Sequence, residues 1–159
     1  AVLSAPRIYI FAKGESYLAG SIFRNNLLKL DRHVTMADDG GLQTLHVKNG
    51  RPGDLFLFLS YSGIHYDYSK YATALSERGI KPCLITAFSD SALARQCDTV
   101  LLIPKSERVI GKVANYSSMI SLTYTLQVIY SLIFNQDYQE NYRVKHEADS
   151  FIFTSFAEI

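Results

Sequence analysis

Short apolar runs alternate along this chain with segments of helical periodicity. Five such runs occur, at residues 8–12, 33–37, 54–59, 82–87 and 99–103. Longer helical patterns are expected at residues 16–30, 65–78 and 116–134, and shorter helices at residues 42–47 and 91–96. Strands that alternate with helices pair in parallel, because each connecting helix crosses back over the sheet. The sequence therefore predicts an α/β domain, a three-layer αβα sandwich with a five-stranded parallel sheet.

Residues 54–59, DLFLFL, indicate which strand is central. The run shows no alternation of polar and apolar residues, as expected for a parallel strand covered on both faces. Gly79 is expected to end the helix at residues 65–78, because glycine tolerates the left-handed turn after a helix. The expected buried face of the helix at residues 16–30 consists of Leu18, Ile22, Phe23 and Leu27.

Composition limits the domain count and excludes several classes of protein. The 159 residues are 48% hydrophobic and 19% charged, which predicts a single domain spanning residues 1–159. Eleven Tyr and nine Phe exclude intrinsic disorder, because they provide ample apolar surface to bury. A formal net charge of +1 argues against a dedicated DNA-binding or membrane-surface module.

Cysteine usage and targeting signals favour a cytoplasmic protein. Cys83 and Cys97 lie in or beside apolar runs, so we expect buried free thiols in a reducing compartment. No charged-then-apolar leader is visible, and residues 119–134 are interrupted by Ser, Thr and Gln, so this stretch is predicted to be too polar and too short for a membrane span. The start at Ala1 rather than Met favours a processed chain or a piece of a longer protein.

Two strand-to-helix turns carry the functional signal. In a parallel α/β sheet, ligands bind beyond the carboxyl ends of the strands, where the strand order reverses. The first and third turns are expected to meet there, and both contain glycine and hydroxyl residues. The first contains Lys13, Gly14, Glu15 and Ser16, and the third contains Ser60, Tyr61, Ser62, Gly63 and His65. Glycine allows close backbone approach, and free helix amides with serine hydroxyls suit a phosphate monoester.

Other interpretations of these turns compete with a phosphate site. Ser and Gly are also ordinary turn and cap residues, so each loop alone could be purely structural. The dinucleotide fingerprint, the Walker loop and the nucleophile elbow are all absent, and Ser62, His65 and Asp67 are too close along the chain for a catalytic triad. The four histidines lack metal-ligand spacing. We therefore expect neither a nicotinamide cofactor nor a metal ion.

Residues 60–67, SYSGIHYD, resemble the S-x-S-G-x-T-x-E signature of SIS (sugar isomerase) domains, and residues 14–16 resemble their first G-x-S turn. Residues 86–94 and 97–101 are similar to two further stretches of that family. The resemblance implies strand order 2-1-3-4-5, as in flavodoxin, a phosphosugar pocket and usually a dimer. It places phosphate against Ser16, Ser60 and Ser62, with His65 where the family has threonine. Lys13 is expected either to support the anion or to point to solvent.

Within the family, the chain is most similar to the effector-sensing domain of RpiR-type transcriptional regulators. Residues 104–107 and 116–119 resemble the glutamate, here Glu107, and the serine-rich helix start of that group. Such a regulator would bind DNA only through a helix-turn-helix domain preceding Ala1. The alternatives are a phosphosugar isomerase or lyase, with Glu107 or His65 as candidate bases without a visible partner, and a purely structural oligomerisation domain. The apolar character of residues 119–134 predicts contact with a second subunit, in a homodimer or tetramer. Residues 135–159 receive no assignment.

Overall fold

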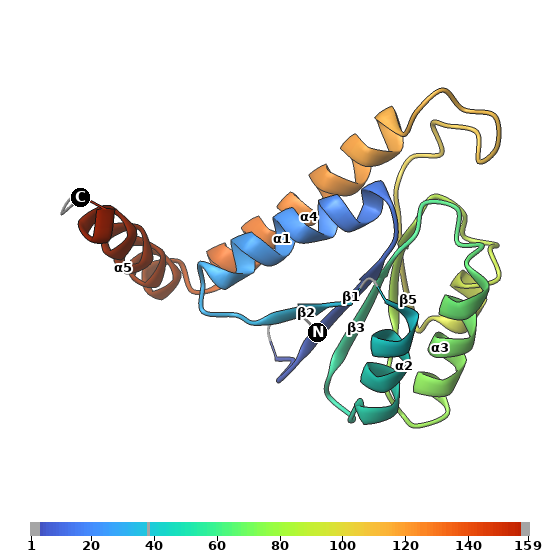
Figure 1. Cartoon of the computed structure of the whole chain (residues 1–159), viewed down its shortest axis with the longest axis horizontal. Helices are drawn as coiled ribbons and strands as arrows, with labels where there is room; N and C mark the ends of the chain where they lie inside the picture. The colour runs from blue at the N-terminus through green and yellow to red at the C-terminus, as the bar shows by residue number, and fades with distance from the viewer. Residues whose placement is uncertain (1–3, 38, 157–159) are drawn as a thin grey trace.

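The structure, a computed structural model, describes residues 4–37 and 39–156. Its sheet has the order β2-β1-β3-β4-β5, and the neighbouring strands all pair in parallel. The strands are β1 (Ile8–Ala12), β2 (Val34–Met36), β3 (Leu55–Leu59), β4 (Cys83–Thr86) and β5 (Thr99–Leu102). On one face lie α1 (Glu15–Leu28) and α4 (Tyr116–Gln136), and on the other lie α2 (Gly40–Asn49) and α3 (Tyr66–Ser76), as Figure 1 shows. The predicted three-layer sandwich and strand order are confirmed.

The central strand β3 divides its side chains between two cores. Leu55, Leu57 and Leu59 pack in the core beneath α1 and α4, while Phe56 and Phe58 pack in the core beneath α2 and α3. All five are at most 7% exposed. The absence of alternation in this run follows from a sheet covered on both faces.

The buried face of α1 matches the expected one at Phe23 and Leu27 and differs from it at Leu18 and Ile22. Leu18 is 56% exposed and Ile22 is 42% exposed, whereas Ala19, Phe23 and Leu27 are fully buried. Gly20 explains the rotation, because a Cβ there would lie 2.8 Å from Met36 Cε. The helix therefore approaches the sheet along its small residues, which leaves Leu18 and Ile22 facing outward.

Two shorter elements were only approximately predicted. Residues 42–47 belong to a ten-residue helix, α2. The side chain of its N-cap residue, Asp39, accepts a hydrogen bond from the Leu42 amide. Residues 91–96 form a loop that ends in a single 3-10 turn, η1 (Ala94–Gln96).

A long helix, α5 (Tyr138–Phe156), occupies the segment that sequence reasoning left unassigned. It extends away from the sheet (Figure 1). Asn141 ties its start to the end of α4, because its amide nitrogen donates to the carbonyl oxygens of Ile133 at 3.2 Å and Phe134 at 3.0 Å. Phe151 and Phe153 are about three-quarters exposed, at 74% and 76%.

The helix α4 extends beyond residues 119–134 at both ends. It has 21 residues and, by length and composition alone, is long and apolar enough to cross a membrane. Core helices of folded domains meet the same criterion, and α4 buries Leu122, Leu126 and Ile133 in the core under α1. Its opposite side presents an exposed apolar stripe at every fourth residue, made of Tyr116, Ile120, Tyr124, Val128 and Leu132.

Candidate functional site

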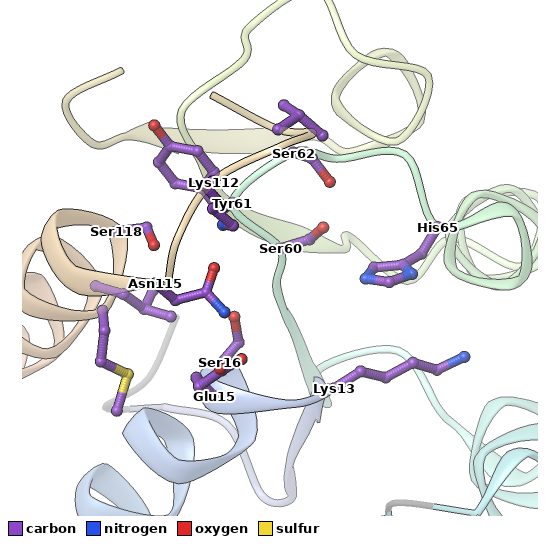
Figure 2. Close-up of a pocket in the computed structure, with 13 residues that line it drawn as sticks. Lys13, Glu15, Ser16, Ser60, Tyr61, Ser62, His65, Lys112, Asn115 and Ser118 are labelled. Atoms are coloured by element: carbon purple, nitrogen blue, oxygen red, sulfur yellow. The ribbon is translucent and has the colours of Figure 1, made fainter. Parts of the chain in front are cut away.

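A cavity of about 160 Å³ lies where β1 and β3 end. From this point α1 and α3 leave toward opposite faces of the sheet, which is the switch point of the strand order. Figure 2 shows the side chains that converge there from three separate segments of the chain. The cavity is therefore at the place where open parallel sheets bind ligands.

Seven of the ten predicted site residues line this cavity. They are Lys13, Glu15, Ser16, Ser60, Tyr61, Ser62 and His65. In particular, Ser16 and Ser62 face the same space although they come from different turns. The remaining three, Gly14, Gly63 and Glu107, shape the surrounding backbone and lie outside the lining.

Residues at the beginning of three helices border the cavity. The N-cap residues are Gly14 for α1, His65 for α3 and Asn115 for α4, and none of them caps its own helix through a side-chain hydrogen bond. The first amides of a helix lack intrahelical partners and carry the positive end of the helix dipole. The starts of α1 and α3 therefore contribute positive potential that favours an anion, whereas the Ser118 amide at the start of α4 is already paired with Glu107.

The turn after β3 requires glycine at one position. Gly63 has a φ of +64°, and a Cβ there would lie 2.6 Å from Ser91 Cβ. Its amide donates to Ser60 Oγ at 3.1 Å, and its carbonyl accepts the Leu93 amide at 3.2 Å. Ser60 is 2% exposed, and its hydroxyl can still donate its own hydrogen while it accepts from Gly63. The turn thus holds Ser60 and Ser62 on a rigid backbone.

Glu107 has partners, contrary to the expectation that it lacks them. Its Oε1 accepts the Ser118 amide at 3.0 Å, and its Oε2 accepts the Ser118 hydroxyl at 2.8 Å. These hydrogen bonds, chiefly the one from the Ser118 amide, lower the pKa of Glu107 to about 2. Its carboxylate therefore caps the start of α4 and is a weak base at neutral pH.

Tyr61 connects the turn after β3 to Glu107. Its hydroxyl donates to the Glu107 carbonyl at 3.0 Å and accepts the Glu107 amide at 2.7 Å. The Tyr61 carbonyl accepts both the Thr86 hydroxyl and the Ala87 amide at 3.0 Å, which fixes this residue to the end of β4. The connection between β5 and α4 is thereby anchored directly to the candidate phosphate turn.

The two lysines of the cavity point in different directions. Lys13 extends away from the serines in Figure 2, and its ammonium lies 3.8 Å from Asp67 on α3. Lys112 instead lies beside Tyr61, with its ammonium 3.4 Å from Glu107 Oε2 and 5.3 Å from the centre of the Tyr61 ring. Its side chain is 25% exposed, against 43% for Lys13. The better-placed cation is the one that sequence reasoning did not select.

His65 and Glu15 set the remaining electrostatics. The His65 ring turns toward Ser60 (Figure 2), and its pKa is lowered by burial and by the positive charge of Lys13. A neutral imidazole offers one donor and one acceptor. Glu15 opposes an incoming anion, because the Asn115 amide chiefly lowers its pKa and keeps the carboxylate charged.

Sequence reasoning missed the third wall of the cavity. That wall consists of Val109, Lys112, Asn115, Ser118, Met119 and Leu122. All six belong to the connection after β5 or to the first turns of α4. The sequence did contain a signal for them. A helix was predicted after the fifth strand, so its start was expected at the same edge of the sheet as the other two turns.

Comparison with known families agrees with this geometry. The SIS domain family model matches residues 2–133. The chain belongs to the SIS domain family. A curated relative, the glutamine–fructose-6-phosphate aminotransferase (isomerizing) of Halalkalibacterium halodurans, is 35% identical over 104 residues. That alignment covers 64% of this chain and 17% of the relative, so the chain spans about a fifth of such enzymes.

Solved structures share the fold of this SIS domain. The Vibrio vulnificus NanR protein, complexed with ManNAc-6P, superposes with a TM-score of 0.86 and 20% identity, over 98% of this chain and 58% of that one. The sugar isomerase domain of an RpiR transcription factor from Sphaerobacter thermophilus gives a TM-score of 0.79 and 22% identity, over 94% and 81% of the two chains.

Proposed function

We propose that this SIS domain is the phosphosugar-binding effector domain of an RpiR-type transcriptional regulator. The observation that carries the proposal is the cavity at the ends of β1 and β3, which is lined by Ser16, Ser60 and Ser62 beside the starts of α1 and α3. Short hydroxyl side chains and helix amides donate hydrogen bonds to a phosphate without filling the space that it needs. The ManNAc-6P complex of the NanR protein supports a phosphorylated sugar as the ligand class.

A regulatory role fits the site better than proton transfer does. An isomerase needs a base with a pKa near the working pH, positioned next to the sugar carbonyl. The pKa of Glu107 is lowered to about 2, and its carboxylate is held by Ser118 behind the cavity. The alternative, a phosphosugar isomerase or lyase, has its support in the aminotransferase relatives and would have to use His65.

The proposal includes partners that lie outside this chain. We expect DNA binding only through an N-terminal helix-turn-helix domain, in a cytoplasmic protein. We also expect a homodimer, because the exposed stripe on α4 is apolar and uncharged along its length. A dimer whose geometry changes when ligand binds would connect the cavity to the DNA-binding domains.

A thermal-shift panel tests the ligand class. Ligand at 100 times its Kd stabilises a domain by about 2.7 kcal/mol, which raises Tm by roughly 5–10 °C at this size. We expect such a shift with N-acetylmannosamine 6-phosphate or a hexose 6-phosphate, and no shift with the unphosphorylated sugar. Ser62→Ala is expected to abolish the difference.

The control substitution is Ser131→Ala, whose hydroxyl bonds within α4 to the Gln127 carbonyl at 3.0 Å. This variant is expected to retain the full shift. Equal shifts for a sugar and its phosphate would remove the phosphate assignment. Turnover of an aldose or ketose phosphate by the purified chain would favour the isomerase alternative.

A further inference from the structure

We propose that Lys112 binds the phosphate group of the ligand, and that its ammonium moves from Glu107 to the phosphate when the ligand enters. This inference rests on the proposed function, because it takes the ligand to be a sugar phosphate. It adds a residue from the connection between β5 and α4 to a site predicted only from the turns after β1 and β3.

Lys112 is positioned beside the candidate phosphate ligands. It lines the same cavity as Ser60 and Ser62, and its ammonium stands over the ring of Tyr61, the residue between those two serines. In Figure 2 it lies beside the turn that carries the candidate phosphate ligands. Lys13, the other lysine of the cavity, is directed toward Asp67.

The Lys112 ammonium has a distant hydrogen-bond partner in the structure. An ammonium group has three N–H donors. Among the described residues, 4–37 and 39–156, the Lys112 ammonium donates to Glu107 Oε2 at 3.4 Å. That distance is long for a charge-assisted hydrogen bond, which is usually about 2.7–2.9 Å. A phosphate in the cavity would offer acceptors to all three hydrogens.

Glu107 has hydrogen-bond partners other than Lys112. Its carboxylate keeps two shorter hydrogen bonds, from the Ser118 amide and the Ser118 hydroxyl, after the ammonium leaves. The side chain of Glu107 is only 9% exposed, yet it remains paired with the start of α4. Glu107 therefore stays hydrogen-bonded when the lysine moves, and it acts as a positioning residue that keeps the ammonium near the cavity.

The test compares two lysine variants in calorimetric titrations with N-acetylmannosamine 6-phosphate and with inorganic phosphate. A charged hydrogen bond accounts for about a 10- to 100-fold change in Kd. We expect Lys112→Met to weaken both probes by that factor, and Lys13→Met to weaken them less than about 3-fold. Lys112→Arg is expected to retain part of the affinity.

A second measurement uses the unmodified chain, so that it does not depend on the folding of a variant. Acetylation of surface amines, followed by mass spectrometry, reports whether each ammonium is engaged. We expect saturating sugar phosphate to slow acetylation of Lys112 several-fold and to leave Lys13 unchanged.

The outcomes separate this inference from the proposed function. If the unmodified chain binds neither probe, the phosphosugar function fails, and the role of Lys112 fails with it. If the chain binds sugar phosphate but Lys112→Met binds as tightly, or Lys13 is the protected amine, the function stands and the role of Lys112 is overturned. Weakened sugar phosphate binding with unchanged inorganic phosphate binding would also overturn the phosphate contact.

Discussion

Replacing Gly63 with alanine tests the rigidity of the candidate phosphate turn. The residue has a φ of +64°, and an added Cβ would meet the side chain of Ser91, 2.6 Å from its Cβ. The left-handed conformation costs an alanine about 1–2 kcal/mol. Overlap in a packed region costs a further 1–3 kcal/mol, approximately. We therefore expect Gly63→Ala to lower the free energy of unfolding by about 2–5 kcal/mol.

The matched control is Gly79→Ala. Gly79 has a similar φ of +72°, but an added Cβ there would have no neighbour within 4 Å. It is therefore expected to cost only the conformational part, about 1–2 kcal/mol. The difference between the two variants isolates the steric contact with Ser91.

Urea denaturation of both variants, monitored by circular dichroism, measures this difference. At a constant m-value, the shift of the urea midpoint reports the change in the free energy of unfolding. Thermal melts are expected to show a loss of roughly 4–20 °C for Gly63→Ala. If Gly63→Ala lowers the free energy of unfolding no more than Gly79→Ala does, the turn accommodates the added methyl group. That result would refute the conclusion that the turn holds Ser60 and Ser62 rigidly. A double-mutant cycle with Ser91→Gly then locates the strain, because coupling is expected only if the two side chains collide.

Three further predictions follow from charge, burial and the exposed stripe. Because the folded pKa of Glu107, about 2, lies below its ordinary value of 4.5, its ionisation stabilises the fold above pH 4.5 and this stabilisation is lost as the pH falls through 2. Urea melts should show Glu107→Gln to be less stable than the unmodified chain at pH 7, with the gap closing toward pH 2; a constant gap would contradict the capping role. Burial raises the pKa of Cys97 to about 12, so at pH 8 only about one thiol in 10⁴ is ionised, and iodoacetamide should label it far more slowly than an unfolded control. Rapid labelling of the native chain, measured by mass spectrometry, would show that the thiol is not desolvated. On the α4 stripe, Ile120→Glu is expected to convert a dimer to a monomer in sedimentation experiments while leaving the circular dichroism spectrum of the fold unchanged, because Ile120 is 70% exposed in the single chain. An unmodified chain that is monomeric at micromolar concentration would contradict this prediction.

Local pattern was sufficient to predict most of the fold. Strand β1 was predicted with its observed bounds, and the uninterrupted apolar run at β3 correctly indicated the centre of the sheet. These features depend on short-range periodicity and on burial of both faces, which a single sequence displays directly. The same logic placed the turns after β1 and β3 at one edge, because parallel strands end on the same side of the sheet.

The errors arise where tertiary contacts decide the outcome. The face of α1 is set by the close approach at Gly20, which no periodicity reveals. The direction of Lys13 depends on Asp67, which lies on α3, and the position of Lys112 depends on Tyr61, which lies in the turn after β3. A charged residue next to a predicted site therefore indicates little until its partner is known.

The most direct test of the central claim is a crystal structure of this domain with N-acetylmannosamine 6-phosphate or, failing occupancy, with a hexose 6-phosphate. The account predicts phosphate oxygens within about 2.5–3.2 Å of the hydroxyls of Ser60 and Ser62. The start of α1 at Ser16 should border the same group. A phosphate bound elsewhere on the molecule, or a sugar that enters the cavity with its phosphate pointing outward to solvent, would contradict the claim.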